Sequence, residues 1–404
     1  MRKTFIILLI AAFSCTMAYA GGYQVRLQGV KQSGMGLVGS STCFGVNSMY
    51  YNPGALGFMK DRFEVSAGIS PIFSSITYRS FESNYTAKTE NPVSPPFYVY
   101  AAGKITDDLV AGIGVMTPYG SKSVWADDWK GRYLIQNIAL KAVFIQPTLT
   151  YKVHDMLSIG VGLDYVMGSV ELQKALPYND NSYANLSGDA TSMGFNVGLI
   201  FKPTDYLTFG IDYRSKVDVT LEGGDAAFYA PASLAGTIPA ANKFGATLPL
   251  PGNLDVGVSW QATEDLLVAF EVNYVMWGVY DTLKFTFEEQ GALLNSSNPR
   301  MYESKIIPRI GIQYNVSDKL QLRAGGYYDP TPANSDYFTP ETVTLNTIAF
   351  TAGLTYIPVR NLEIDVAFLQ TLGQETDMNY TPGNFGGKYK SASSIPGLGI
   401  TYKF

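Results

Sequence analysis

Long apolar runs are scarce in this chain, although 46% of its 404 residues are hydrophobic and only 16% are charged. After residue 20, no stretch approaches the roughly eighteen consecutive apolar residues that a membrane-crossing helix requires. The sequence therefore excludes helical membrane spans beyond that point. The many apolar residues must instead follow a pattern that hydropathy windows average away.

Cysteine, histidine and net charge are also scarce. Of the two cysteines, only Cys43 lies beyond residue 20, so the processed chain is not expected to contain an intramolecular disulfide. The single histidine, His154, cannot build a Cys/His metal cluster, so we expect no metal and no other cofactor. A formal net charge of −5 gives no reason to expect a nucleic acid partner.

Residues 1–20 have the organisation of a secretory signal peptide. Arg2 and Lys3 supply the positive region, residues 5–13 the apolar region, and Ala18-Tyr19-Ala20 the cleavage motif. The alternative is a lipoprotein signal with Cys15 as the lipidated residue, but a bulky phenylalanine stands two positions before it. We therefore predict a secreted chain that starts at residue 21.

Strict alternation of apolar residues is the dominant signal in the rest of the chain. Apolar side chains occupy every second position over 143–153 and again over 157–167, separated by a turn at 154–156. The same arrangement surrounds turns at 203–205, 263–265 and 358–360. Strands with an apolar outer face, a polar or small inner face and short turns at one end are typical of a transmembrane barrel.

From residue 63 onward, the alternation predicts an all-β, antiparallel barrel of about 14 strands. The connections alternate between short turns and long loops, which is the plan of bacterial outer membrane barrels. Residues 21–60 do not alternate, so we predict an N-terminal hatch (21–60) in the lumen of a barrel (61–404). The fourteen strand candidates are 63–80, 95–105, 109–117, 141–154, 157–171, 190–202, 206–221, 248–262, 266–286, 302–315, 319–328, 345–357, 361–372 and 394–404.

The parity of each strand also predicts its two faces. Phe195, Val197 and Phe201 are expected to face outward, whereas charged residues such as Asp212 and Glu271 are expected to face inward and form ion pairs. The parity changes near Gly278, where we expect a bulge.

The chain ends on Phe404, after Leu398, Ile400 and Tyr402 on the same face. A terminal aromatic residue on an alternating strand resembles the assembly signal of outer membrane barrels. We therefore expect contact with the outer membrane barrel assembly machinery during biogenesis, contact with outer membrane lipids afterwards, and a monomer in the bacterial outer membrane.

Several motifs, taken in order, resemble the FadL/TodX (OmpP1) family of outer membrane transporters for hydrophobic compounds. They are Ser33-Gly34-Met35-Gly36, "YNPGAL" from Tyr51, "TPYG" from Thr117, "WKGRYLI" from Trp129, "LPLPG" before the eighth strand, and the terminal phenylalanine. The resemblance covers nearly all of the processed chain.

This resemblance implies a lumen hatch whose motif is Asn52-Pro53-Gly54. Here glycine stands where the family has alanine. Asn-Pro followed by glycine is also a simple turn former. The resemblance further implies a kink in the third strand that opens a lateral gap in the wall. Gly112, Gly114 and Pro118 are the candidates, because glycine weakens a strand and proline removes a ladder donor.

Apolar residues that the strand pattern leaves in the hatch and loops are candidates for ligand binding. Packing of the hatch and loops against the wall is the simpler explanation for each of them. The inner-pocket candidates are Val46, Met49, Tyr50, Phe58, Met59, Met116 and Phe144; the outer-loop capture candidates are Trp125, Trp129, Leu134, Phe228, Leu234 and Phe244. Basic residues that could bind a carboxylate from the lumen are Arg214, Arg309, Arg323 and Lys141.

The resemblance predicts passive transport of hydrophobic molecules, either fatty acids or hydrocarbons. The molecules would be captured at the loops, transferred to the hatch pocket and released sideways. Three alternatives remain at this point: a porin for hydrophilic solutes, a surface adhesin, and an enzyme. Catalysis is disfavoured because His154 sits in a short turn rather than near the outer rim.

Overall fold

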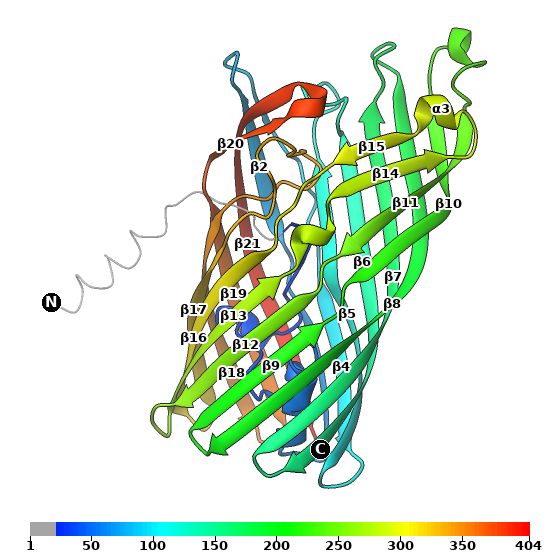
Figure 1. The fold of residues 1–404 in the computed structure, drawn as a ribbon. Helices are drawn as coiled ribbons and strands as arrows, with labels where there is room; N and C mark the ends of the chain where they lie inside the picture. The colour runs from blue at the N-terminus through cyan, green and yellow to red at the C-terminus, as the bar shows by residue number, and fades with distance from the viewer. Residues whose placement is uncertain (1–21) are drawn as a thin grey trace, which may run out of the picture.

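The computed structural model describes residues 22–404, so the predicted signal peptide lies outside the described part of the chain. One antiparallel sheet closes on itself. Strand β1 (Phe63–Ile69) pairs with β4 (Phe97–Lys104) on one side and with the last strand, β21 (Phe385–Lys403), on the other. The closed wall has 14 strand positions, which confirms the predicted barrel (Figure 1).

The other wall positions consist of either one long strand or two collinear segments. The single strands are β5 (Leu109–Val124), β6 (Asn137–His154), β7 (Leu157–Ala175), β8 (Tyr183–Thr204), β17 (Leu320–Asp329), β18 (Thr347–Val359) and β19 (Leu362–Gly373). The segmented positions are β9 (Leu207–Arg214) with β10 (Val217–Tyr229), β11 (Ala241–Leu250) with β12 (Asn253–Gln261), β13 (Leu266–Val275) with β14 (Thr282–Phe287), and β15 (Ser296–Pro299) with β16 (Lys305–Ser317).

Two predicted strands are interrupted in the structure. The candidate at 63–80 is divided into β1 and β2 (Phe73–Ser80), because Pro71 lacks the backbone donor that a ladder needs. The candidate at 266–286 is divided by the 3₁₀ turn η4 (Trp277–Val279), so the irregularity expected at Gly278 is a turn rather than a bulge. Strand β2 pairs with β21 and with the short strand β3 (Thr86–Lys88).

Several segments predicted as loops are strand over about half of their length. Strand β5 continues to Val124, β6 begins at Asn137, and β10 and β11 together cover much of residues 222–247. The remaining loop elements are η3 (Ala232–Leu234), α3 (Gly291–Leu294), β20 (Thr376–Tyr380) and η5 (Thr381–Gly383). The end of the barrel that carries α3 and β20 is called the loop end, and the opposite end, where the C-terminus lies, is the turn end (Figure 1).

The two faces of the wall follow the predicted parity. Outward residues such as Phe195 and Phe201 are exposed, whereas Asp212 and Glu271 are buried inside. Among residues 22–404, no helix has the length and hydropathy needed to span a membrane.

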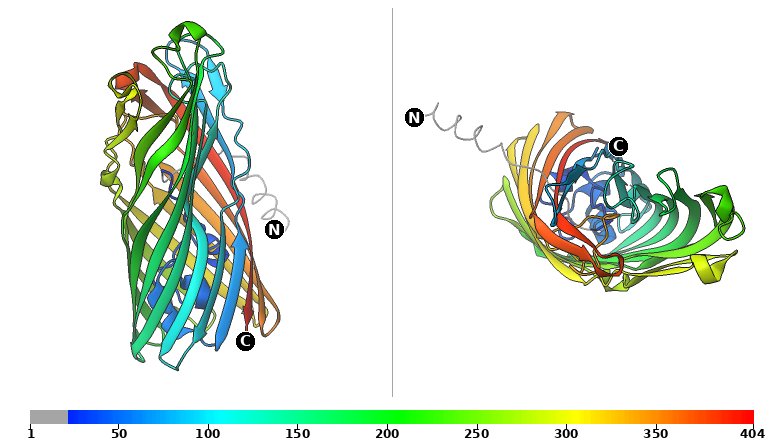
Figure 2. Two further views of the ribbon diagram at one scale, coloured as in Figure 1. Left: turned by 90° about the vertical axis from the view of Figure 1, so that its right-hand side faces the viewer. Right: turned by 90° about the horizontal axis from the view of Figure 1, so that it is seen from above.

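Residues 22–60, called the inner segment, lie inside the barrel toward the turn end (blue in Figures 1 and 2). They contain α2 (Val30–Ser33), η1 (Gly45–Ser48) and η2 (Pro53–Phe58). Helix α2 contacts β18, β19 and β21, and η2 contacts β6, β7 and β8. Wall glycines permit this packing: a Cβ at Gly210 would lie 1.9 Å from the Ser40 carbonyl oxygen, and one at Gly198 would lie 2.1 Å from Asn52 Oδ1.

Candidate functional site

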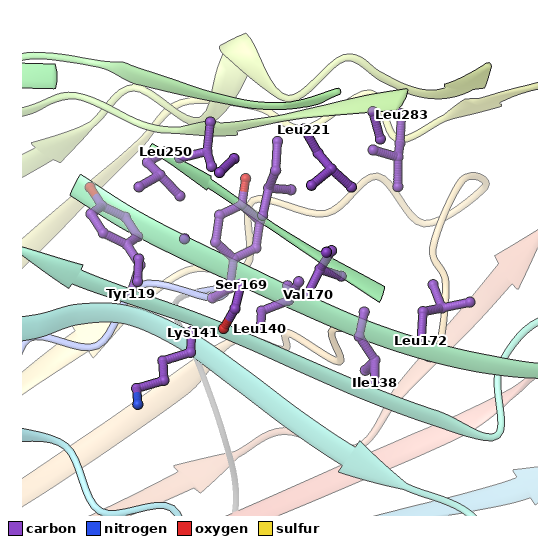
Figure 3. Close-up of a pocket in the computed structure, with 18 of the residues that line it drawn as sticks. Tyr119, Ile138, Leu140, Lys141, Ser169, Val170, Leu172, Leu221, Leu250 and Leu283 are labelled. Carbon is purple, nitrogen blue, oxygen red and sulfur yellow. The ribbon is translucent and has the colours of Figure 1, made fainter. Parts of the chain in front are cut away.

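An apolar cavity, called the inner cavity, borders the first residues of the inner segment, because Tyr23 is part of its lining. Figure 3 shows residues that line this cavity. The cavity contains about 890 Å³ of space not occupied by protein atoms. Most of its lining is aliphatic and comes from β6, β7, β8, β10 and β11, with three tyrosines at its edge; the lining includes Leu140, Val170, Leu172, Leu221, Leu250, Tyr23, Tyr119 and Tyr280. Such a lining suits a hydrophobic ligand with few polar groups.

A second hollow, the outer pocket, lies at the loop end and contains about 880 Å³. Leu134, Phe228 and residues of α3 line it together with Lys174 and Arg300. Four residues line both the outer pocket and the inner cavity, namely Leu172, Leu186, Phe285 and Glu341. The two hollows are therefore adjacent, with a mostly apolar boundary.

The wall is interrupted beside the inner cavity. The β4–β5 ladder ends at the Tyr98–Met116 pair, and the β5–β6 register shifts between Met116 and Tyr119. Beyond this point β5 no longer has β4 as a neighbour. The interruption ends toward the loop end where the Glu90 amide donates to the Val124 carbonyl at 2.8 Å.

A third hollow, the wall cavity, occupies this interruption and contains about 1420 Å³. Residues 92–97 and the end of β5 line it. Four residues line both the wall cavity and the inner cavity: Tyr119, Gly120, Leu140 and Lys141. The inner cavity is therefore bordered by the outer pocket on one side and by the wall cavity on another.

Residues 22–25 of the inner segment occupy the place of the missing neighbour strand. The Val25 amide donates to the Pro118 carbonyl and the Gly120 amide donates to the Tyr23 carbonyl, both at 2.8 Å. Gln24 is thus paired antiparallel with Tyr119. Because Tyr23 lines the inner cavity and Gln24 lines the wall cavity, this short segment separates the two.

The three residues predicted to kink the third strand occupy different positions. Pro118 lies within the register shift of β5. Gly112 and Gly114 lie in an unbroken part of the ladder, opposite Ala102 and Tyr100. The discontinuity is therefore at the proline, where a backbone donor is missing.

Six of the seven inner-pocket candidates lie together in one buried cluster; they are Val46, Met49, Tyr50, Met59, Met116 and Phe144. None of them lines the inner cavity or the wall cavity. Phe58 is only half-buried and lies at the turn end, where the Lys202 ammonium is 4.2 Å from its ring centre. These side chains pack the inner segment against the wall, and the inner cavity lies farther toward the loop end.

The outer-loop candidates are divided between the hollows and their surroundings. Leu134 and Phe228 line the outer pocket, and Phe244 lines the inner cavity. Trp125 and Trp129 are buried and stacked on each other, with ring centres 4.1 Å apart. Leu234 is partly buried against the same apolar cluster.

Most of the inner-cavity lining was not among the predicted site residues. Some of it, such as Leu140, Leu172 and Leu186, lies where loops were predicted, and the rest lies on predicted strands whose inner face was expected to be polar or small. The sequence does contain a signal for this lining, namely a change in which alternate positions of a strand are apolar. Along β7 the apolar residues are outward at Leu163 and Tyr165, but they are inward at Val170 and Leu172, where outward Glu171 is polar. Such an inversion indicates a wall segment whose outer face is exposed to water and whose inner face is apolar.

Most of the basic residues considered for carboxylate binding are committed to internal contacts. Arg214 is bound to Asp164 at 2.6 Å, Arg309 lies 3.7 Å from Glu271, and Arg323 lies 3.9 Å from Asp365. The lumen position expected for Lys141 is wrong. Its neighbour Ala142 is the buried, inward residue, and Lys141 is exposed and points away from the inner cavity in Figure 3.

Buried ion pairs fasten the inner segment to the wall. Arg26 contacts Asp255 at 2.9 Å and Glu271 at 3.3 Å, and Lys31 pairs with Glu363. Burial disfavours the charged form of Arg26, but the two carboxylates outweigh it and hold the pKa of the guanidinium above its usual value. Removing one partner of such a pair leaves an uncompensated buried charge, which is strongly destabilising.

The predicted hatch motif is a hydrogen-bonding centre of the inner segment. The Asn52 side chain accepts a hydrogen bond from the Gly54 amide at 2.9 Å, which caps η2. Its amide group donates to the carbonyls of Ser40 at 2.6 Å and Leu199 at 3.0 Å. The Pro53 carbonyl accepts from Thr150 Oγ1 at 2.8 Å. The motif therefore joins two parts of the inner segment to each other and to β6 and β8.

Replacement of Asn52 with alanine is expected to weaken the docking of the inner segment by about 2–4 kcal/mol, because a cap and several buried hydrogen bonds are lost. Hydrogen exchange of the amides in residues 39–57 should accelerate accordingly. Asn361→Ala is the matched control, because the exposed Asn361 side chain donates to the Lys403 carbonyl at the turn end. Unchanged exchange in Asn52→Ala would contradict the role given to Asn52.

His154 is the exposed last residue of β6, and its Nδ1 accepts a hydrogen bond from the Met156 amide, in the turn to β7, at 3.2 Å. Within residues 22–404, no group of three or more His, Cys, Asp or Glu residues is arranged to hold a metal ion. The structure thus gives His154 a role in the turn.

Comparisons with known proteins agree with this architecture. The family described as "Outer membrane protein transport protein (OMPP1/FadL/TodX)" matches residues 11–404. A putative outer membrane protein of Neisseria meningitidis is 25% identical over all of this chain and 99% of its own length. A long-chain fatty acid transport protein of Escherichia coli is 22% identical, with 100% and 98% covered. The crystal structure of a Pseudomonas aeruginosa FadL homologue superposes with a TM-score of 0.83 at 21% identity, covering 95% of this chain and 100% of that one.

Proposed function

The chain belongs to the OMPP1/FadL/TodX family of outer membrane transport proteins, and from this premise we propose a route by which it moves hydrophobic molecules such as long-chain fatty acids. The family is one of transporters for hydrophobic compounds in the outer membrane, not of enzymes. The route runs from the outer pocket into the inner cavity and leaves sideways through the wall cavity. Transport is passive, and residues 22–25 close the exit.

The observation that carries this proposal is the sharing of lining residues between successive hollows. Leu172, Leu186 and Phe285 border both the outer pocket and the inner cavity. Tyr119 and Leu140 border both the inner cavity and the wall cavity. A hydrophobic molecule would therefore move from one apolar surface to the next without full exposure to water, so the free-energy cost of each transfer is small.

Sideways release is favoured over passage through the inner segment. The hollow at the turn end contains about 1310 Å³, but it is mainly polar and shares no lining residue with the inner cavity or the wall cavity. The inner segment between them is buried and fastened by ion pairs. In the proposal, this segment is the hatch, and its first residues move so that the ligand enters the outer membrane.

We also propose what the outside of the barrel contacts. Lipids of the outer membrane contact the apolar outward face, which includes Leu163, Val197 and Ile211. The protein acts as a monomer in this proposal, because its sheet closes on itself within one chain and leaves the wall without an open edge. The C-terminal aromatic strand is the signal for the barrel assembly machinery.

Filling the inner cavity is expected to block uptake. Ala190 lines this cavity, so an Ala190→Trp variant should lower the uptake of a long-chain fatty acid into vesicles by about tenfold or more, equivalent to about 1.4 kcal/mol. Ala352→Trp is the matched control, because Ala352 is exposed on the outward face. Equal uptake by wild-type vesicles and protein-free vesicles would refute the proposed function. Normal uptake by Ala190→Trp would refute the route through the inner cavity.

A further inference from the structure

Four basic side chains, called the basic patch, lie together on the outward face of β2, β3 and β21 near the loop end. One residue of β2 separates Lys88 of β3 from Lys390 of β21 in the ladder. In the next outward row toward the loop end, Arg79 of β2 is directly opposite Lys388 of β21. Tyr389 between the two β21 lysines is buried, so both lysines point outward. Because opposed residues have Cβ atoms about 4.5–5.5 Å apart, the four basic groups occupy a compact area.

The basic patch lies beyond the part of the wall that contacts lipid tails. On β21 the exposed apolar residues extend from Phe404 to Leu398, and Lys390 is fourteen residues before Phe404. At about 3.3 Å per residue and a strand tilt of about 40°, this separation is a height of roughly 35 Å. The apolar band of such barrels is only about 25 Å tall, and their long loops face the outside of the cell. The patch is therefore at the level of the lipid head groups of the outer leaflet.

The positive charge of the basic patch is only partly compensated. Arg79 Nη2 lies 3.7 Å from Glu375 Oε2. Lys388 Nζ lies 3.2 Å from Asp377 Oδ1. The other two members of the patch have no ionic partner among residues 22–404. Two positive charges therefore lack a counter-charge.

The opposite sign dominates the outward face of β7, β8 and β10. The exposed charged residues near the loop end of these strands are mainly acidic and include Glu171, Asp189 and Glu222. Next to the basic patch, the exposed Lys122 of β5 and the exposed Glu90 add one charge of each sign, which leaves the excess unchanged. The excess of positive charge is therefore a property of one side of the barrel, and it favours a ligand with more than one negative charge.

We propose that the basic patch binds the phosphate groups of lipid A, the phosphorylated membrane anchor of the lipopolysaccharide in the outer leaflet. Lys88 and Lys390 supply the counter-charge for the phosphates, and the arginine adds planar donors that suit phosphate oxygens. The acyl chains of lipid A would lie along the apolar outward face toward the turn end. Ile76 of β2 lines the wall cavity, so the bound lipid A would lie beside this cavity. The inference does not depend on the proposed transport route.

The experiment measures the equilibrium binding of purified lipid A to the full chain in detergent micelles by native mass spectrometry. Wild type should bind lipid A with two phosphates at least about tenfold more tightly than lipid A without them, and added salt should weaken this binding. Lys88→Gln/Lys390→Gln should bind the phosphorylated form about 10- to 30-fold more weakly, because each basic residue near an anionic lipid surface contributes about fivefold.

The matched control is Lys216→Gln/Lys243→Gln, which removes the same charge from the outer surface. Both lysines are exposed, and each is already paired with an aspartate at 2.6 Å. This variant should bind lipid A as wild type does.

Four results would overturn the inference. Equal binding of lipid A with and without phosphates by wild type would exclude phosphate recognition. Unchanged binding by Lys88→Gln/Lys390→Gln would place the site elsewhere. Equal affinity of wild type for phosphatidylglycerol would indicate a surface for anionic lipids in general. Displacement of lipid A by polyglutamate would indicate an acidic polypeptide as the partner. None of these results bears on the uptake of hydrophobic molecules.

Discussion

Uptake of a long-chain fatty acid should fall to the level of protein-free vesicles when residues 22–25 are covalently tied to β5. The variant is Gln24→Cys/Tyr119→Cys, made in a Cys43→Ser background so that no other thiol after residue 20 interferes. Gln24 and Tyr119 are directly opposite each other, between the hydrogen bonds of Val25 with Pro118 and of Tyr23 with Gly120. Such a pair has Cα atoms about 4.5 Å apart, which suits a disulfide.

The physical reason is the position of this short segment. Tyr23 lines the inner cavity and Gln24 lines the wall cavity, so the ligand must displace residues 22–25 to pass from one to the other. A disulfide prevents that displacement, whereas the backbone hydrogen bonds alone are each worth only about 0.5–1.5 kcal/mol. Reduction of the same protein should restore uptake.

The reduced double variant serves as the internal control for the loss of the Tyr119 side chain. A second control is Thr220→Cys/Thr247→Cys, because these opposed residues are exposed and lie away from the wall cavity. Oxidation of this pair should leave uptake unchanged. If the oxidised Gln24→Cys/Tyr119→Cys variant transports as fast as its reduced form, residues 22–25 do not close the exit, and the exit lies elsewhere.

The sequence predicted the lipid-facing part of the barrel well, because there every apolar residue reports the outside. Phe195, Val197 and Phe201 are examples in which parity alone gave the correct face. The inner segment was also recognisable, because residues 21–60 are the long stretch before the wall that does not alternate. Within the membrane, one face of each strand contacts lipid and the other faces the lumen, and the alternation of apolar and polar residues follows from this difference.

The inner cavity could not be predicted in the same way. Beyond the apolar band, the outside of the wall is polar and the inside is apolar, so Leu140, Val170 and Leu172 do not extend the outward pattern. Leu140 and Leu172 therefore fell in predicted loops, and Val170 fell at the end of a predicted strand whose inner face was expected to be polar or small. The pairing of residues 22–25 with β5 was equally hidden, because it joins backbone groups and leaves no side-chain periodicity. A proline such as Pro118 indicates a possible break but not what fills it.

Glu271→Leu should convert the closed barrel into a conducting one. Glu271 is fully buried, and its Oε2 accepts hydrogen bonds from the amides of Gly39 at 2.8 Å and Ser40 at 2.7 Å. Its Oε1 lies 3.3 Å from Arg26 and 3.7 Å from Arg309. Leucine has a similar volume but supplies no acceptor. The amides of Gly39 and Ser40 therefore lose their acceptor, and the guanidinium groups of Arg26 and Arg309 lose this negative partner. We expect this change to weaken the contact between the inner segment and β13 by about 3–5 kcal/mol.

The barrel itself should survive this change, because its backbone ladder is untouched and only the docking of the inner segment is weakened. Wild-type protein in planar bilayers is expected to show no large steady conductance, whereas Glu271→Leu should show frequent large openings as the inner segment detaches. Glu171→Leu is the matched control, because Glu171 is exposed on the outward face of β7. A silent Glu271→Leu barrel of normal thermal stability would mean that the ion pairs do not hold the inner segment. A wild type with a large steady conductance would favour an open porin, because a lumen closed by buried residues 22–60 cannot pass ions freely.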